Sequence, residues 1–157
     1  MTVKLLFVCL GNICRSPLAE AAFRAEAARI GLDAEADSAG TGGWHRGEPP
    51  DHRAIAAAGR NGVNISHLRA RQVRPEDFER FDHVVALDDD NLADLDALRP
   101  AGSRARLSLL LDHVPGREGE AVADPYYGGD RDFDITWRDV TEAARALADT
   151  LAKEAAL

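Results

Sequence analysis

Residues 3–18 read VKLLFVCLGNICRSPL, and this stretch predicts a strand, a short loop and a helix in succession. Its first six residues are apolar apart from Lys4, which is typical of a strand buried in a parallel sheet. Ser16 is a good N-cap residue, and Pro17 suits the first position of a helix. The residues from Cys9 onward therefore form a loop that leads from the strand to the N-terminus of the helix.

The rest of the chain alternates strand patterns with helix patterns. The expected strands cover 3–8, 34–38, 82–87 and a part of 104–111, and the expected helices cover 16–30, 51–60, a segment capped by Asp88, and a last segment that starts near Asp132 or Asp134. This alternation predicts a single α/β domain over residues 1–157. We expect a three-layer sandwich in which helices cover both faces of a four-stranded parallel sheet. Ligands of such folds bind beyond the carboxyl ends of the strands.

Composition narrows the class of protein. The chain has 157 residues, with 27 acidic against 19 basic side chains and a net charge of −8, so a nucleic-acid partner is not expected. The apolar run at the N-terminus is too short for a secretory signal or a membrane span. The only cysteines, Cys9 and Cys14, give no disulfide framework, so we expect a reducing cytoplasm, with export without a signal left open.

The loop after the first strand carries the chemistry. Its backbone N–H groups and the helix dipole favour a bound anion, and the planar guanidinium of Arg15 can hold two oxygens of a tetrahedral oxyanion. This positive field favours the thiolate form of Cys9, which is a nucleophile. Gly11 permits tight turning, and Asn12 tolerates a left-handed backbone. The Ser16 hydroxyl either caps the helix or donates to the Cys9 sulfur, and the two roles are compatible.

The run VCLGNICRSP, residues 8–17, resembles the phosphate loop of the low-molecular-weight protein tyrosine phosphatases. The likeness extends over nearly the whole chain, through Asp37–Thr41 with Trp44, Gly47 and Pro50–Asp51, through His67 with Ala70–Arg71 and Asp77–Phe78, and through Asp124–Gly128. It implies an enzyme that hydrolyses phosphotyrosine in proteins and small aryl phosphates. In that family the leading cysteine of the loop is the nucleophile, and the aspartate of the Asp-Pro pair is the general acid.

The resemblance assigns roles by position. It makes Cys9 the nucleophile, Arg15 the phosphate ligand and Asp124 the general acid and later the general base. The residues expected to bind substrate are Leu10, Gly11, Asn12, Ile13, Cys14, Ser16, Trp44, Tyr126 and Tyr127. Ser38 and His67 are expected to hold Asn12 and the loop in a hydrogen-bond network, and an acidic residue near Asp88 to orient the loop or its arginine.

The resemblance also suggests two forms of regulation and no cofactor. Cys14 is expected to form a reversible disulfide with oxidised Cys9, which would protect the nucleophile. Tyr126 or Tyr127 is a candidate target for a tyrosine kinase. We expect no metal, because Arg15 and the loop amides neutralise the transferring group.

Three alternatives remain at this stage. An arsenate reductase shares the fold and the opening loop, but its relay uses three cysteines and this chain has two. A protein-arginine phosphatase tends to carry threonine where this chain has Ile13. A phosphate-binding module without catalysis would keep Arg15 but would not need Cys9 or Asp124.

Overall fold

A four-stranded parallel sheet forms the centre of the computed structural model, which describes all 157 residues. Its strands are β1 (Val3–Cys9), β2 (Ala34–Gly40), β3 (His83–Ala86) and β4 (Arg106–Leu109). They lie in the order β2-β1-β3-β4, and every neighbouring pair is parallel. The expected sheet is therefore confirmed.

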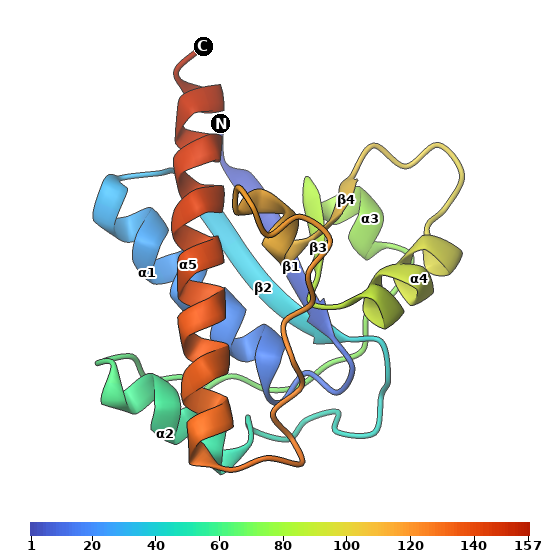
Figure 1. Ribbon diagram of the computed structural model, residues 1–157. Coiled ribbons are helices and arrows are strands. Elements are labelled where there is room, and N and C mark those ends of the chain that lie inside the picture. The colour runs from blue at the N-terminus through green and yellow to red at the C-terminus, as the bar shows by residue number, and fades with distance from the viewer.

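Helices cover both faces of this sheet (Figure 1). They are α1 (Arg15–Ile30), α2 (His52–Arg60), α3 (Asp77–Arg80), α4 (Asp89–Leu98), α5 (Asp130–Ala155) and the 3-10 helix η1 (Leu110–His113). α1 and α5 pack together on one face, and α3 and α4 lie on the other (Figure 1). The arrangement is the expected three-layer sandwich. No helix has both the length and the apolar character that a membrane span requires.

The central strand β1 supplies side chains to both layers of the core. Leu5 and Phe7 belong to the larger apolar cluster with α1 and α5, whereas Leu6 and Val8 belong to the smaller cluster with α3 and α4. All four residues are at most 1% exposed. A strand with both faces buried reads as a continuous apolar run, which is why the sequence pattern of this strand is so clear.

The connection from β1 lies where the strand order changes direction. The chain passes from β1 to β2 on one side of it and later returns to β3 on its other side. Crevices for ligands form at such switch points, beyond the carboxyl ends of the strands. Cys9 is the last residue of β1, so the fold places its thiol at this point.

The structure corrects three details of the expected elements. α1 begins at Arg15 with Cys14 in the N-cap position, so Ser16 is not the N-cap and Pro17 is not the first helical residue. α5 begins at Asp130, slightly earlier than expected. The four-residue elements α3 and η1 were not expected, because they are too short to show a helical period.

Candidate active site

Asn12 fixes the conformation of the loop between β1 and α1. It is the only residue other than glycine with a positive φ, at 59°. Its Nδ2 group donates to Ser16 Oγ (2.8 Å) and to Ser38 Oγ (3.0 Å), and its Oδ1 atom accepts from the Arg71 backbone N–H (3.0 Å). A left-handed backbone costs free energy in a residue with a side chain. Three hydrogen bonds to a side chain that is 3% exposed offset that cost and hold the loop in one shape.

The network around Asn12 is stabilised further by Glu20 and by the ion pairs of Arg71. Ser38 Oγ donates to Glu20 Oε1 at 2.8 Å, and burial raises the pKa of the Glu20 carboxyl. The guanidinium of Arg71 forms ion pairs with Asp37 (3.1 Å) and with Asp77 (3.0 Å). The loop is therefore held from one side by α1 and β2 and from the other by the segment that contains Arg71.

The expected role of His67 is wrong. Its side chain is exposed and does not join the network around Asn12, whose Oδ1 atom accepts from the Arg71 backbone N–H. Ser38 does join the network as expected. The error arose because a backbone N–H can replace an imidazole as donor, and a sequence pattern does not distinguish the two.

The Cys9 sulfur lies beside the Ser16 hydroxyl. Sγ and Oγ are 3.0 Å apart, and Ser16 is fully buried. Ser16 does not cap α1 and instead contacts the Cys9 sulfur, and either atom of this pair can be the donor. A hydroxyl that donates to sulfur stabilises the thiolate form.

Arg15 is buried and is held by partners from three parts of the chain. Its Nη1 atom lies 2.6 Å from Asp88 Oδ2 and 3.1 Å from the Val122 carbonyl oxygen, and its Nη2 atom lies 3.7 Å from Asp124 Oδ2. Burial disfavours its charge, but the nearby Cys9 and the hydrogen bond to Asp88 outweigh that effect and raise the pKa of Arg15. The guanidinium therefore stays charged and is fixed in direction.

A cavity of about 230 Å³ opens at this point. It is lined by Cys9, Leu10, Gly11, Ile13, Cys14, Arg15, Trp44, His45, Asp124, Tyr126 and Tyr127. A thiol, a guanidinium and a carboxyl thus meet in one small space, although Asp124 lies far from the loop in the sequence. Asn12 and Ser16 do not line the cavity and instead support the loop from within.

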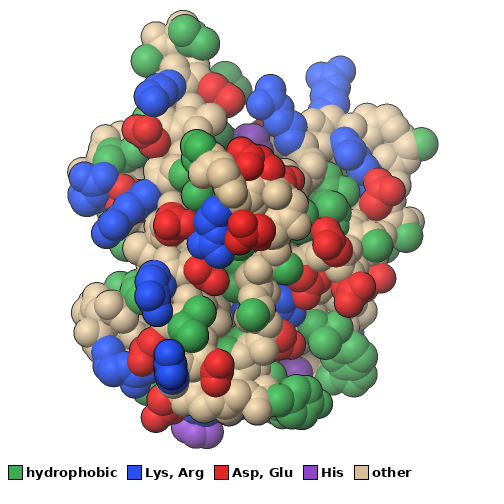
Figure 2. Space-filling view, viewed as in Figure 1, with side chains coloured by type: hydrophobic (Ala, Val, Ile, Leu, Met, Phe, Trp, Pro, Cys, Tyr) green, Lys and Arg blue, Asp and Glu red, His purple; other side chains and the backbone are tan.

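Aromatic side chains surround the mouth of the cavity. Trp44 is 72% exposed, Tyr126 40% and Tyr127 96%. Figure 2 shows hydrophobic side chains gathered at the lower right edge of the molecule, to which the carboxyl ends of the strands point in Figure 1. The two tyrosine rings meet edge to face with centroids 5.0 Å apart. Exposed aromatic surface beside a deep polar site is suited to a ligand with an aromatic ring.

Arg53 of α2 anchors the loop that carries Asp124. Its guanidinium donates to the carbonyl oxygens of Gly128 (2.9 Å) and Tyr126 (3.0 Å) and pairs with Asp51 at 2.9 Å. Asp124 Oδ1 in turn accepts from the Tyr126 N–H at 3.1 Å. No sequence pattern singled out Arg53, His45, Glu20 or the side chain of Arg71, because the parts of the site that they contact are distant from them in the sequence.

Fold and site together define a class of protein: an α/β domain with a cysteine-led loop, shaped for a tetrahedral oxyanion, at the switch point of its sheet. Residues 4–157 match the family described as low molecular weight phosphotyrosine protein phosphatase. A protein of that name from Schizosaccharomyces pombe is 45% identical over 134 residues, which are 83% of this chain and 85% of that protein. The chain therefore belongs to the low molecular weight phosphotyrosine protein phosphatase family.

Solved structures agree with this assignment. A protein tyrosine phosphatase from Entamoeba histolytica has a TM-score of 0.91 and 34% identity, covering 97% of this chain and 98% of that chain. A more distant neighbour is YwlE from Bacillus subtilis, described as an arginine phosphatase and solved with a phosphorylated serine in its active site. It has a TM-score of 0.87 and 28% identity, covering 96% of this chain and 97% of that chain.

Proposed function

We propose that this chain hydrolyses phosphotyrosine in proteins, and small aryl phosphates, through a phosphocysteine intermediate on Cys9. The observation that carries the proposal is the meeting of Cys9, Arg15 and Asp124 in one cavity of about 230 Å³. A nucleophile, a fixed cation and a carboxyl are the three groups that metal-free phosphoryl transfer from an aryl ester requires.

In the first step the Cys9 thiolate attacks phosphorus, a sulfur–phosphorus bond forms and the bond from phosphorus to the phenolic oxygen breaks. Arg15 and the loop amides hold the phosphoryl oxygens while this happens. The protonated Asp124 carboxyl gives its proton to the departing phenolate. Its half-exposed position, 3.7 Å from the Arg15 guanidinium, supports this role.

In the second step water attacks the phosphocysteine. The Asp124 carboxylate, left without its proton by the first step, accepts one from this water. The sulfur–phosphorus bond breaks, inorganic phosphate leaves and the Cys9 thiolate is restored. The Ser16 hydroxyl, 3.0 Å from the sulfur, stabilises the thiolate both as nucleophile and as leaving group.

The walls of the cavity favour an aryl ester. A phosphorylated tyrosine is long enough to reach the buried loop while its ring lies between Trp44 and Tyr126, whereas phosphoserine is too short. Ile13 also lines the cavity and is half-buried, so the wall near the phosphate is apolar. An apolar residue there suits an aromatic ring better than a charged phosphoguanidinium, which favours phosphotyrosine over phosphoarginine.

Turnover of p-nitrophenyl phosphate by wild type, Cys9→Ser and Asp124→Ala tests the mechanism. We expect no turnover by Cys9→Ser and a fall in kcat of about a hundredfold or more for Asp124→Ala. Undiminished activity of Cys9→Ser would overturn the mechanism. A parallel assay with phosphotyrosine, phosphoarginine and arsenate separates the three enzyme activities, and a phosphate-binding module would turn over none of them.

We also propose that Tyr126 or Tyr127 accepts phosphate from a tyrosine kinase and that the chain acts in the cytoplasm. The exposure of Tyr127 supports the first point, because a kinase needs an accessible hydroxyl. A kinase assay that leaves both tyrosines unlabelled, or fractionation that finds the protein outside the cytoplasm, would contradict these points.

A further inference from the structure

The Trp44 ring rests directly against the α-carbon of Gly42. A methyl group at position 42 would fall 1.8 Å from Cζ3 of Trp44 and 2.3 Å from Cε3. Both distances are far shorter than any contact between carbon atoms. The ring can occupy this position only because residue 42 has no side chain.

Gly42 is itself attached to the phosphate loop. Its N–H donates to the Leu10 carbonyl at 2.9 Å, and the Thr41 N–H donates to the Cys9 carbonyl at 2.9 Å. These bonds tie the residues that follow β2 to the end of β1 and to the loop after it. The surface that supports the Trp44 ring is therefore fixed to the strand that carries the nucleophile.

His45, the next residue in this wall, also lies against a glycine. A methyl group at Gly11 would come within 3.0 Å of His45 Cδ2. Trp44 and His45 thus both line the cavity, and the ring of each packs against a glycine, which has no side chain in the way. Because two adjacent residues of the cavity wall pack on glycines in the same way, we infer that these glycines shape the wall.

We propose that Gly42 is a specificity-determining residue of this enzyme, because it sets the position from which Trp44 contacts the aromatic ring of the substrate. The inference rests on the proposed hydrolysis of aryl phosphates. A side chain at position 42 displaces the indole from the cavity wall, so the enzyme loses contact with the ring of the substrate but keeps its hold on the phosphate.

The expected change in stability distinguishes this role of Gly42 from a purely structural one. Gly42 does not have a positive φ, so its backbone conformation is open to alanine. Trp44 is 72% exposed, and its ring can turn into solvent without opening the core. The methyl group should therefore alter ligand binding while stability changes little.

The first test compares ligands with and without a ring. For Gly42→Ala we expect KM for phenyl phosphate to rise about three- to tenfold, the range that the loss of one aromatic contact gives. We expect kcat to stay unchanged, since Cys9, Arg15 and Asp124 are not touched. Competitive inhibition by phenylphosphonate should weaken by the same factor, whereas inhibition by inorganic phosphate should not change.

Gly43→Ala is the matched control. Its methyl group would meet Gln72 Oε1 at 2.8 Å and Arg46 Nε at 3.3 Å, so the same loop is changed at a different contact. We expect wild-type KM for phenyl phosphate in this variant. A double-mutant cycle completes the test, because Gly42→Ala should have no further effect when Trp44→Ala is already present.

The position of the indole can be observed directly. The chain has two tryptophans, so in a Trp137→Phe background the fluorescence comes from Trp44 alone. We expect Gly42→Ala to increase quenching by iodide, as the ring moves into solvent. Wild-type quenching and wild-type KM in Gly42→Ala, with a raised KM in Trp44→Ala, would overturn the inference and leave the proposed function intact. Failure of wild type to hydrolyse phenyl phosphate would instead overturn the proposed function.

Discussion

Asp88 Oδ2 lies 2.6 Å from Nη1 of Arg15, while Oδ1 of the same carboxylate accepts from the Asn91 N–H at 2.8 Å. One aspartate thus both caps α4 and holds the arginine of the phosphate loop. Because Arg15 is 2% exposed, little water reaches its charge, which Cys9 and the Asp88 carboxylate stabilise in place of water. The N-terminus of α4 and the anion site are therefore coupled through a single side chain.

Replacement of Asp88 by asparagine separates these two roles. Asparagine is as good an N-cap as aspartate, so α4 should keep its cap while Arg15 loses its ion pair. We expect the variant to lose about 2 kcal/mol of stability in urea unfolding, below the loss for a fully buried pair because the Asp88 side chain is 23% exposed. KM for aryl phosphates should rise about tenfold as Arg15 loses its direction. Unchanged stability together with unchanged KM would contradict this account.

Ser16→Ala should lower the reactivity of the Cys9 thiol. The variant removes the hydroxyl that lies 3.0 Å from the sulfur, and a hydrogen bond to a charged group is worth enough to slow alkylation by iodoacetate at pH 6 about tenfold. Ser38→Ala is the control. It removes the other acceptor of the Asn12 amide but no contact to Cys9, so its alkylation rate should stay near that of wild type. Equal slowing in both variants would mean that the loop, and not the sulfur contact, is responsible.

Arg53→Leu should impair protonation of the leaving group. Without the guanidinium, the carbonyl groups of Tyr126 and Gly128 lose their anchor, and the loop that carries Asp124 becomes less ordered. We expect kcat for phenyl phosphate to fall about tenfold, and kcat for p-nitrophenyl phosphate to fall less because its leaving group needs a proton less. Arg60→Leu is the control, since this arginine of α2 pairs with Asp134 and not with the loop. Equal losses for the two substrates would argue against a role through Asp124.

Cys14 should protect the nucleophile slowly at neutral pH. Peroxide converts the Cys9 thiolate to a sulfenic acid, and attack by the Cys14 thiol then gives a disulfide and releases water. Burial, together with the nearby Asp51 carboxylate, raises the pKa of the Cys14 thiol, so little thiolate is present at pH 7. After peroxide and then dithiothreitol, wild type should recover more activity at pH 8.5 than at pH 6.5, and Cys14→Ser should recover little at either. Equal recovery by the variant and wild type would exclude this protection.

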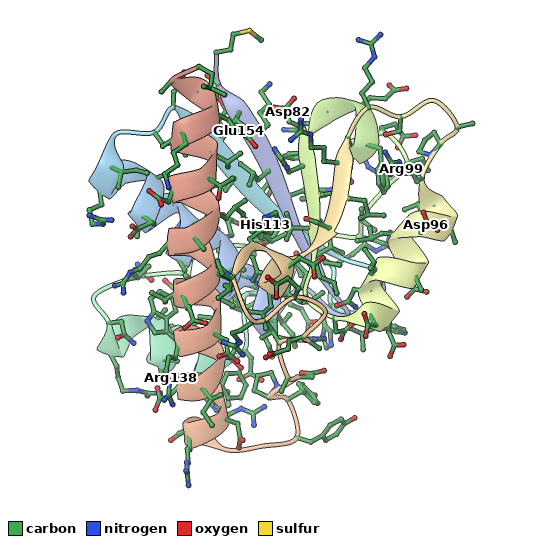
Figure 3. All side chains as sticks on the ribbon, turned by 45° about the horizontal axis from the view of Figure 1, so that its top comes forward. Asp82, Asp96, Arg99, His113, Arg138 and Glu154 are labelled. Carbon is green, nitrogen blue, oxygen red and sulfur yellow. The ribbon has the colours of Figure 1, made fainter.

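Two histidines, His83 and His113, lie outside the active site, where the first is buried and the second half-buried. His83 begins β3, and the His113 ring is within 2.9 Å of Ser108 Oγ. Figure 3 shows Glu154, near the end of α5, and Asp82, just before β3, at the top of the view, with His113 below them. Burial lowers the pKa of both histidines. Arg106 lowers the pKa of His83 further, and His83 lowers the pKa of His113. Glu154 has the opposite effect on both pKa values.

These histidines predict a loss of stability in acid. The imidazoles take up protons less readily in the folded chain than in the unfolded chain, whose histidines titrate near pH 6.5. Their contribution to the free energy of unfolding is therefore complete above that pH. It is lost as the pH falls toward the lower pKa values that the two histidines have in the folded chain. Each histidine contributes at most about 1.4 kcal/mol per pH unit. Urea unfolding between pH 7.5 and 5 should show a shallower decline for His113→Gln than for wild type. His67→Gln, which changes an exposed side chain, should decline as wild type does.

The sequence predicted the elements with strong local patterns. The run from Val3 to Val8 is continuously apolar because both of its faces are buried, and that pattern depends on nothing distant in the chain. The Cys9-to-Arg15 loop is likewise recognisable from residue types alone. Short elements such as α3 and η1 lacked a readable period, and the N-cap of α1 was misplaced because Ser16 bonds to sulfur instead of capping the helix.

The sequence by itself therefore determined the layered fold and the position of the loop from Cys9 to Arg15, since strand burial, turning residues and helix starts are local properties. Only the tertiary structure decided which atoms meet in the site. The carboxylates of Asp88 and Asp124, both expected from the resemblance, reach Arg15 together with the carbonyl oxygen of Val122. The Arg71 backbone N–H takes the place expected of His67 beside Asn12, and Trp44 packs against Gly42. Residue type alone cannot predict such contacts, because they depend on how distant segments pack and on which donor reaches a buried acceptor.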